Sequence, residues 1–125
     1  MAKKKILIVD DEQNIRLLVS RILSSEYDVI EAKDGKEAIE VYKKSVSDGK
    51  PFDLVIMDLT IPGGMGGKEA VAKLHESYPN AKVIVSSGYS EDPIMSEYKK
   101  YGFSGVINKP FNANQVSEAI SKILG

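Results

Sequence analysis

The sequence predicts an α/β fold in which a parallel sheet of five strands is covered by helices on both faces. Five short apolar runs recur along the 125 residues, and segments with apolar residues at helical spacing lie between them. Strands that alternate with helices imply right-handed crossovers and a parallel sheet. Because the apolar runs are mostly continuous, the strands are expected to be buried on both faces.

The first 50 residues predict two strands and two helices. Lys5–Val9 is an apolar run typical of a buried strand. The helix expected after it has its apolar residues on one stripe: Ile15, Leu18, Val19, Ile22 and Leu23. The run Tyr27–Ala32 is more polar, which favours a strand at an edge of the sheet. Asp34-Gly35 marks a turn before a second helix, which extends toward Asp48-Gly49.

The middle of the chain predicts two further strands with a loop and a helix between them. The strands are Asp53–Met57, which we expect at the centre of the sheet, and Val83–Val85. The glycine-rich stretch Pro62–Gly67 predicts a loop. A third helix is expected to begin at about Lys68 and to end near Pro79.

The last third of the chain predicts two helices around a fifth strand, Gly105–Ile107. Pro93 suits the first turn of a helix and Gly102 suits its C-terminal cap, so one continuous helix is expected between them. Asn112 and Gln115 have the spacing of a capping box at the start of the last helix. The apolar stripe of that helix is Val116, Ala119, Ile120, Ile123 and Leu124.

The composition narrows the classes of function. With 42% hydrophobic residues, 28% charged residues and a net charge of −1, the chain is typical of one globular domain. Such a charge gives no field that would attract nucleic acid or an anionic membrane. The sequence has no cysteine, which excludes disulfides and thiolate metal sites. We expect a single domain over residues 1–125, with no output domain, located in the cytoplasm.

Charged and hydroxyl side chains follow four of the predicted strands at the points where the strands end. Asp10 and Asp11 follow the first strand, and Asp58 follows the third. Ser87 comes at the end of the fourth strand and Lys109 after the fifth. Because the carboxyl ends of parallel strands share one edge, these groups are expected to meet in one crevice, where open α/β sheets bind ligands.

These residue types suggest phosphoryl chemistry assisted by a metal ion. Three carboxylates in one crevice repel one another, and a hard dication such as Mg²⁺ would relieve that repulsion. A carboxylate can also act as a nucleophile and form an aspartyl-phosphate. Asp58 is the best candidate because its strand is expected at the centre of the sheet. Lys109 would contact one phosphoryl oxygen, and the Ser87 hydroxyl would bond another.

Four motifs occur in a fixed order along the chain. They are Val9-Asp10-Asp11-Glu12, Met57-Asp58-Leu59, Ser86-Ser87-Gly88 and Asn108-Lys109-Pro110-Phe111. Together they make the whole chain resemble the receiver domain of two-component response regulators. The resemblance implies a three-layer, doubly wound (βα)₅ fold of the flavodoxin-like type, with a five-stranded parallel sheet in the order 2-1-3-4-5.

The resemblance also implies a role for each residue at this edge. Asp58 would accept a phosphoryl group from a phosphohistidine, in a reaction that depends on Mg²⁺ or Mn²⁺. Asp11, Asp58 and the backbone carbonyl of Thr60 would ligate the metal. Asp10 would act largely through water, and Ser87 would take the place of the switch hydroxyl.

As a receiver domain the chain would be a signalling switch rather than an enzyme, because it would catalyse only its own phosphorylation and dephosphorylation. Its phosphodonor would be a sensor histidine kinase or a histidine phosphotransfer protein. The fourth helix, fifth strand and fifth helix would present a face to a downstream partner or, weakly, to a second copy. The Pro62–Gly67 loop resembles receivers attached to hybrid sensor kinases. Neither nucleic acid nor a membrane is expected as a partner.

Four further predictions concern individual positions. Receivers commonly have Tyr or Phe three residues before the lysine, where this chain has Val106, so the aromatic part of the usual switch is missing. Tyr89 is expected to shield the phosphoryl group from water and to slow autodephosphorylation. The Lys109–Pro110 peptide is expected to be cis. His75, the only histidine, is expected at the surface.

Two other functions match parts of the pattern. A phosphatase of the haloacid dehalogenase type also uses an Asp nucleophile after a strand, but it needs a second Asp where this chain has Thr60. A flavodoxin-like FMN carrier needs a phosphate loop rich in Ser, Thr and Gly. This chain has Asp10-Asp11-Glu12 there, which would repel the flavin phosphate. Turnover of a phosphomonoester would favour the first alternative, and a coloured protein the second.

Overall fold

The computed structural model describes residues 3–88, 92–109 and 111–125 and confirms the predicted α/β fold. Its five strands form one parallel sheet in the order β2-β1-β3-β4-β5. The strands are β1 (Lys4–Val9), β2 (Tyr27–Ala32), β3 (Leu54–Asp58), β4 (Val83–Ser87) and β5 (Gly105–Asn108). The helices are α1 (Gln13–Leu23), α2 (Gly35–Ser47), α3 (Gly67–Ser77), α4 (Pro93–Ser96), the 3₁₀ helix η1 (Tyr98–Tyr101) and α5 (Ala113–Leu124).

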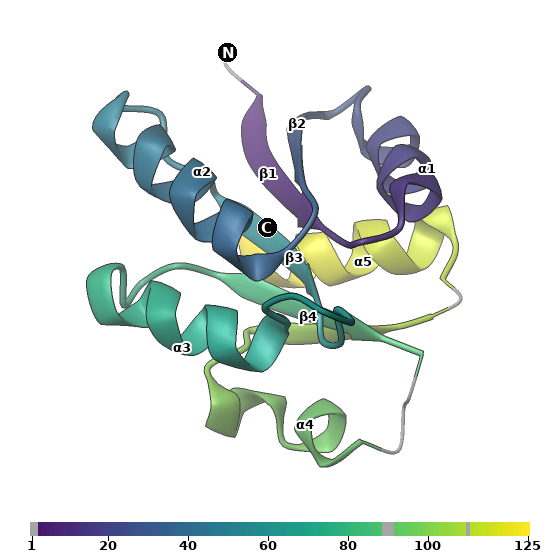
Figure 1. The fold of residues 1–125 in the computed structure, drawn as a ribbon. Helices are drawn as coiled ribbons and strands as arrows, with labels where there is room; N and C mark the ends of the chain where they lie inside the picture. Colours follow the sequence, from purple (N-terminus) through teal and green to yellow (C-terminus); the bar gives the residue numbers. More distant parts are fainter. Residues whose placement is uncertain (1–2, 89–91, 110) are drawn as a thin grey trace.

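Two hydrophobic cores lie on opposite faces of the sheet, because each buried strand contributes side chains to both. In β1, Leu7 and Val9 pack with residues of α2 and α3, whereas Ile6 and Ile8 pack with residues of α1 and α5. Figure 1 shows these two helix pairs on opposite sides of the sheet. Successive side chains of a strand point to opposite faces, which explains why this strand has a continuous apolar run.

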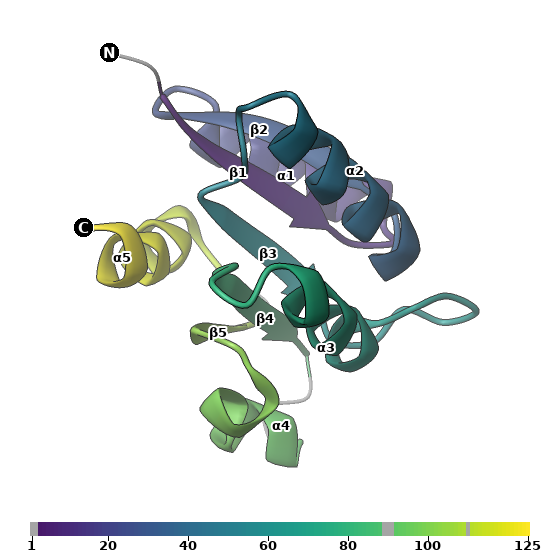
Figure 2. The same cartoon turned by 90° about the vertical axis from the view of Figure 1, so that its left-hand side faces the viewer.

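The order and register of the strands bring their carboxyl ends to one edge of the sheet. As predicted, β2 lies at an edge and β3 at the centre, between β1 and β4. Asp58 at the end of β3 faces Ser86, and Ser87 at the end of β4 faces Asn108. Figure 2 shows the strands running in the same direction, so that polar residues after neighbouring strands lie close in space.

Capping signals in the sequence are confirmed. The Asn112 carboxamide accepts the Gln115 N–H at 2.9 Å, and the Gln115 carboxamide accepts the Asn112 N–H at 2.9 Å, which completes a capping box at the start of α5. Asp34 accepts the Glu37 N–H at 2.9 Å, so the predicted turn is the N-cap of α2. Gly102 has a φ of +96° and ends η1 in the left-handed conformation that favours glycine.

The prediction of one continuous helix from Pro93 to Gly102 is wrong. α4 has four residues, and the next turn has 3₁₀ geometry, with the Lys100 N–H donating to the Glu97 carbonyl at 3.0 Å. Met95 and Phe103 are both buried in the core beside this segment. Packing of these two side chains overrides the helical spacing of the local sequence.

Two predictions of burial are also wrong. Leu18, expected on the buried stripe of α1, is 47% exposed, because α1 directs Val19 and Leu23 into the core instead. His75, expected at the surface, is half-buried at the end of α3, where its Nε2 lies 2.8 Å from the Ala81 carbonyl oxygen. Both differences arise from the rotation of a helix against its neighbours, which periodicity does not specify.

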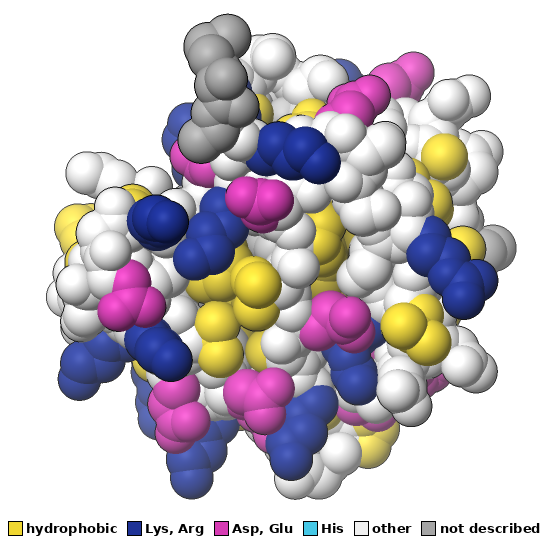
Figure 3. Space-filling model, turned by 90° about the horizontal axis from the view of Figure 1, so that it is seen from above, with side chains coloured by type: hydrophobic (Ala, Val, Ile, Leu, Met, Phe, Trp, Pro, Cys, Tyr) yellow, Lys and Arg dark blue, Asp and Glu magenta, His cyan; other side chains and the backbone are white. Residues whose placement is uncertain are grey.

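The surface carries charges of both signs. Figure 3, which views the molecule from the side where the N-terminus lies, shows basic and acidic side chains interspersed around small apolar patches. This mixture agrees with the net charge of −1. Within the described ranges, no helix is both long enough and apolar enough to cross a membrane.

Candidate functional site

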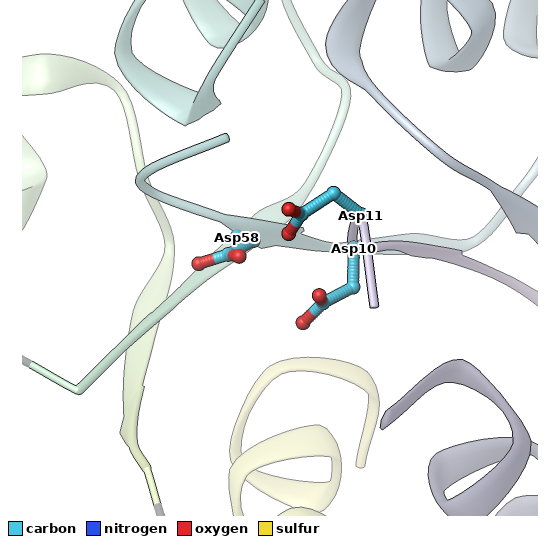
Figure 4. Close-up of side chains that lie close together, drawn as sticks. All are labelled: Asp10, Asp11 and Asp58. Atoms are coloured by element: carbon cyan, nitrogen blue, oxygen red, sulfur yellow. The ribbon is translucent and has the colours of Figure 1, made fainter. Parts of the chain in front are cut away.

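Three carboxylates meet where β1 and β3 end (Figure 4). Asp10 and Asp11 directly follow β1, and Asp58 is the last residue of β3. Each offers an oxygen within 4.8 Å of the others. Asp10 and Asp58 are 2% and 6% exposed, whereas Asp11 faces solvent. The structure therefore gathers the three acidic residues around one space of the size of a cation.

The Lys109 ammonium lies against two of these carboxylates. Its Nζ is 2.7 Å from Asp10 Oδ2 and 3.3 Å from Asp58 Oδ2. The Lys109 backbone N–H donates to the Ser87 carbonyl at 2.9 Å, which extends the β4–β5 pairing by one residue and sets where the side chain starts. Three carboxylates and one ammonium leave this cluster with a formal charge of −2.

Burial disfavours the ionised form of Asp58. Its pKa is raised to about 6, chiefly by burial, and the negative charge of Asp10 adds to this rise. The Lys109 ammonium and a hydrogen bond from the Thr60 backbone both oppose the rise. Burial acts to lower the pKa of Lys109, but its hydrogen bonds to Asp10 and Asp58 and their charges outweigh burial, so that this pKa is raised. A cation close to Asp58 would favour its ionised form.

An open cleft of about 430 Å³ lies over Asp58. Its lining comes from the ends of β1, β3, β4 and β5: Asp11, Glu12, Asp58, Thr60, Pro62, Ser87, Gly88 and Lys109. Ser87 is buried in its wall, and Thr60 is exposed at its rim. Asp10 lies beneath, in contact with Lys109. All six residues predicted for the site are thus at this cleft or next to it.

Comparison with known proteins identifies the α/β family to which this chain belongs. The sequence profile described as the response regulator receiver domain matches residues 6–121. The chain belongs to this family. The resemblance drawn from the four motifs is therefore confirmed, and the chain is a receiver domain of two-component signalling.

Relatives match this receiver domain over nearly its whole length. The chemotaxis protein CheY of Thermotoga maritima is 38% identical over 122 residues, which cover 96% of this chain and 97% of the relative. Sporulation initiation phosphotransferase F of Bacillus subtilis is 34% identical over 125 residues, with coverage of 99% and 96%. The solved structure of Vibrio cholerae CheY4 has a TM-score of 0.87 at 30% identity and covers 98% of this chain and 100% of its own. The CheX–CheY–BeF₃–Mg²⁺ complex from Borrelia burgdorferi has a TM-score of 0.89 at 26% identity, with coverage of 99% and 91%.

Two supporting contacts of the receiver site were missed by sequence reasoning. The Glu12 N–H donates to Asp10 Oδ1 at 2.9 Å, and Arg16 Nη1 donates to the Asp10 backbone oxygen at 2.6 Å. The sequence does show Arg16 about one turn into the helix that follows Asp10 and Asp11. Which group the Arg16 side chain contacts, however, depends on how α1 packs.

The end of the glycine-rich loop packs against the backbone of Leu59, the residue that directly follows β3. A Cβ on Gly66 would collide with the Leu59 carbonyl oxygen, and the Gly67 N–H donates to that same oxygen at 3.1 Å. The Gly35 N–H donates to the Met65 carbonyl at 2.8 Å, which ties the loop to the start of α2. Glycine at position 66 is therefore required by a close approach of two backbones.

The positions expected to govern the switch are described only in part. Val106 is half-buried in β5 and packs against the core shared with α2 and α3. Tyr89 and Pro110 lie outside the described residues. Shielding of the phosphoryl group by Tyr89 and a cis Lys109–Pro110 peptide therefore stay predictions.

Proposed function

We propose that this receiver domain takes a phosphoryl group from a phosphohistidine onto Asp58, in a reaction that depends on Mg²⁺ or Mn²⁺. The strongest support is the placement of the Asp58 carboxylate, 3.3 Å from the Lys109 amine and beside two further carboxylates at an open cleft. An Asp58 oxygen would form a bond to phosphorus while the P–N bond of the donor breaks. The bonding pair would leave on the imidazole nitrogen.

The side chains present fit a hard divalent cation. Carboxylate oxygens are ligands that Mg²⁺ prefers, and the cluster has a formal charge of −2 before an ion binds. Asp11, Asp58 and the backbone carbonyl of Thr60 would hold the ion, and Asp10 would act through water. When bound, the ion would supply positive charge to the phosphoryl oxygens.

Lys109 and Ser87 would complete the binding of the phosphoryl group. The Lys109 ammonium already reaches the Asp58 carboxylate, so that it would contact an oxygen of a phosphoryl group attached there. The Ser87 hydroxyl, in the wall of the same cleft, would bond another oxygen. Phosphoryl transfer depends mainly on such positioning and charge stabilisation, which these two groups would provide.

Two relatives support this assignment through their own descriptions. The Bacillus subtilis relative is a phosphotransferase, and the Borrelia burgdorferi structure is a CheY protein with CheX, BeF₃ and Mg²⁺. For this chain we infer a sensor histidine kinase or a histidine phosphotransfer protein as the phosphodonor. We place the reaction in the cytoplasm, where cells keep the ATP from which such donors are phosphorylated.

Phosphorylation would change which partner the chain binds, without turnover of any other substrate. It would add roughly one net negative charge to the cleft and bias the positions of Ser87 and Lys109. The expected partner face, formed by the fourth helical segment (α4 and η1), β5 and α5, lies next to these residues. A recess of about 280 Å³ on this face is lined by residues of η1, β5 and α5. Tyr98 and Val106 line this recess, with Glu118 at its side. A downstream partner, or weakly a second copy, would bind this face in one of the two states.

Acetyl phosphate with Mg²⁺, followed by intact-mass measurement, tests the assignment of Asp58. We expect wild type to gain one phosphoryl group and Asp58→Asn to gain none. Asp28→Asn, the same chemical change at an exposed position of β2, is the control and should behave as wild type. An equal gain of mass in Asp58→Asn would contradict the proposal.

The same samples discriminate the two alternative functions. Stoichiometric labelling without turnover of a phosphomonoester would exclude a phosphatase, and a colourless protein would exclude an FMN carrier. Repeated turnover of a phosphomonoester would instead support the phosphatase.

A further inference from the structure

The Arg16 side chain in α1 connects the end of β1 to the edge strand β2. Its Nη1 donates to the Asp10 backbone oxygen at 2.6 Å, and its Nε donates to Glu31 Oε1 at 3.1 Å. The Arg16 side chain is 16% exposed, and that of Glu31 is 36% exposed. The guanidinium therefore lies in a well-defined position beside the acidic cluster.

The contact with Arg16 acts on the backbone of Asp10. The Asp10 carboxylate already accepts the Glu12 N–H at 2.9 Å and the Lys109 ammonium at 2.7 Å, and its N–H donates to the Ala32 carbonyl at 3.2 Å. Arg16 binds the remaining polar group of Asp10, its carbonyl. Because the peptide group is planar, a tilt of this carbonyl would also move the Cα of Asp11, whose side chain lines the cleft.

We infer that Arg16, held by Glu31, is a positioning residue that aims the carboxylates of Asp10 and Asp11 at the divalent cation. This inference rests on the proposed function. A guanidinium holds two acceptors at once in a fixed planar geometry, which the single ammonium of lysine does not reproduce. Glu31 also offsets the guanidinium charge, so that the cation site does not lie next to an unpaired positive charge.

Charge and geometry predict opposite results when Arg16 is replaced by an uncharged residue. Removal of a positive charge near a cation site would tighten Mg²⁺ binding by simple electrostatics. Loss of positioning would weaken Mg²⁺ binding, by about 10-fold if Arg16 acts as other residues that hold metal ligands in place. The sign of the change in the dissociation constant therefore separates the two effects.

Calorimetric titration with Mg²⁺ tests this inference on wild type, Arg16→Met, Arg16→Lys and Arg21→Met. Arg21 is an exposed arginine of the same helix, so its replacement causes the same loss of charge away from the site. We expect Arg16→Met to bind Mg²⁺ about 10-fold more weakly and Arg16→Lys to recover part of that loss. Arg21→Met should bind as wild type.

Two results would overturn the inference: an unchanged or lower Mg²⁺ dissociation constant in Arg16→Met, or an equal weakening in Arg21→Met. Heteronuclear NMR spectra without Mg²⁺ check that each variant is folded. If Arg16→Met does not fold, Arg16→Lys is the test, with the same expected sign and a smaller change.

Glu31→Gln combined with Arg16→Met shows whether Glu31 acts through Arg16. We expect Glu31→Gln to weaken Mg²⁺ binding in wild type and to add nothing in Arg16→Met, whereas additive losses would overturn that part of the inference. Failure of wild type to bind Mg²⁺ would reject the proposed function. Normal binding by both wild type and Arg16→Met would reject the positioning role alone.

Discussion

An aspartate lies at each end of β3, and the two have opposite effects on the stability of the protein. Asp53 directly precedes the strand, and Asp58 is its last residue. At the N-terminal end, exposed Asp53 accepts the backbone N–H of Lys5 at 2.7 Å. At the C-terminal end, Asp58 is buried and shares the Lys109 ammonium with Asp10. One side chain joins two strands, while the other belongs to a cluster in which carboxylates outnumber their cation.

Burial and charge balance explain this difference. A hydrogen bond at the solvent-exposed rim requires little desolvation and contributes about 1 kcal/mol. At the C-terminal end, the single Lys109 ammonium cannot fully offset the free-energy cost of burying the carboxylates of Asp10 and Asp58. The C-terminal end therefore gains affinity for a cation from an arrangement that, without the ligand, lowers stability.

The largest effect on stability is expected from removing the Lys109 ammonium at the buried, C-terminal end of β3. Lys109→Met would leave Asp10 and Asp58 buried without their ammonium. We expect the free energy of unfolding without Mg²⁺ at neutral pH to fall by about 3 kcal/mol, as measured by urea denaturation. Lys100→Met is the control, because Lys100 forms an exposed pair with Glu97 at 3.7 Å, and such pairs contribute less than about 1 kcal/mol. Equal losses in both variants would contradict the comparison.

A smaller effect, dependent on pH, is expected from Asp58 itself. Its pKa in the folded protein is about 6, above the ordinary value of 3.8, so the fold favours the protonated form. Its contribution to stability is therefore present below pH 3.8 and is lost as the pH rises through about 6. At neutral pH without Mg²⁺, Asp58→Asn should be more stable than wild type by about 2 kcal/mol.

Urea denaturation at several pH values checks this expectation. The difference between Asp58→Asn and wild type should grow between about pH 4 and pH 6 and then become constant. Asp53→Asn, at the other end of the strand, should not be more stable than wild type, because Asp53 accepts the Lys5 N–H. A difference for Asp58→Asn that does not depend on pH would contradict the role of burial.

The smallest effect is expected at the N-terminal end. Asp53→Ala removes the acceptor of the Lys5 N–H, and we expect a loss of about 1 kcal/mol in the free energy of unfolding. Asp53→Asn keeps an acceptor and should lose less. Phosphorylation and Mg²⁺ affinity should not change in either variant, and a change in either property would show that the two ends of the sheet are coupled.

The sheet and the acidic residues at its edge were predictable because their signals are local. Apolar runs and the capping box of Asn112 and Gln115 depend on residues close together in the chain. The parallel topology then brings the strand ends together. The first two strands end where predicted, but the other three were predicted to end one or two residues early. β3 continues through Asp58, β4 through Ser87 and β5 through Asn108, where pairing with neighbouring strands includes polar residues.

Residue types and their spacing along the chain establish the α/β fold and the set of groups that gather at the carboxyl edge of the sheet. The sequence did not predict three features: the hydrogen bond from Arg16 to Asp10, the exposure of Leu18 and the interruption of the helix after α4. They depend on how helices rotate and pack against elements far away in the chain. Periodicity shows that a helix has an apolar face, but the neighbours that this face meets, and the distances that result, are set by packing.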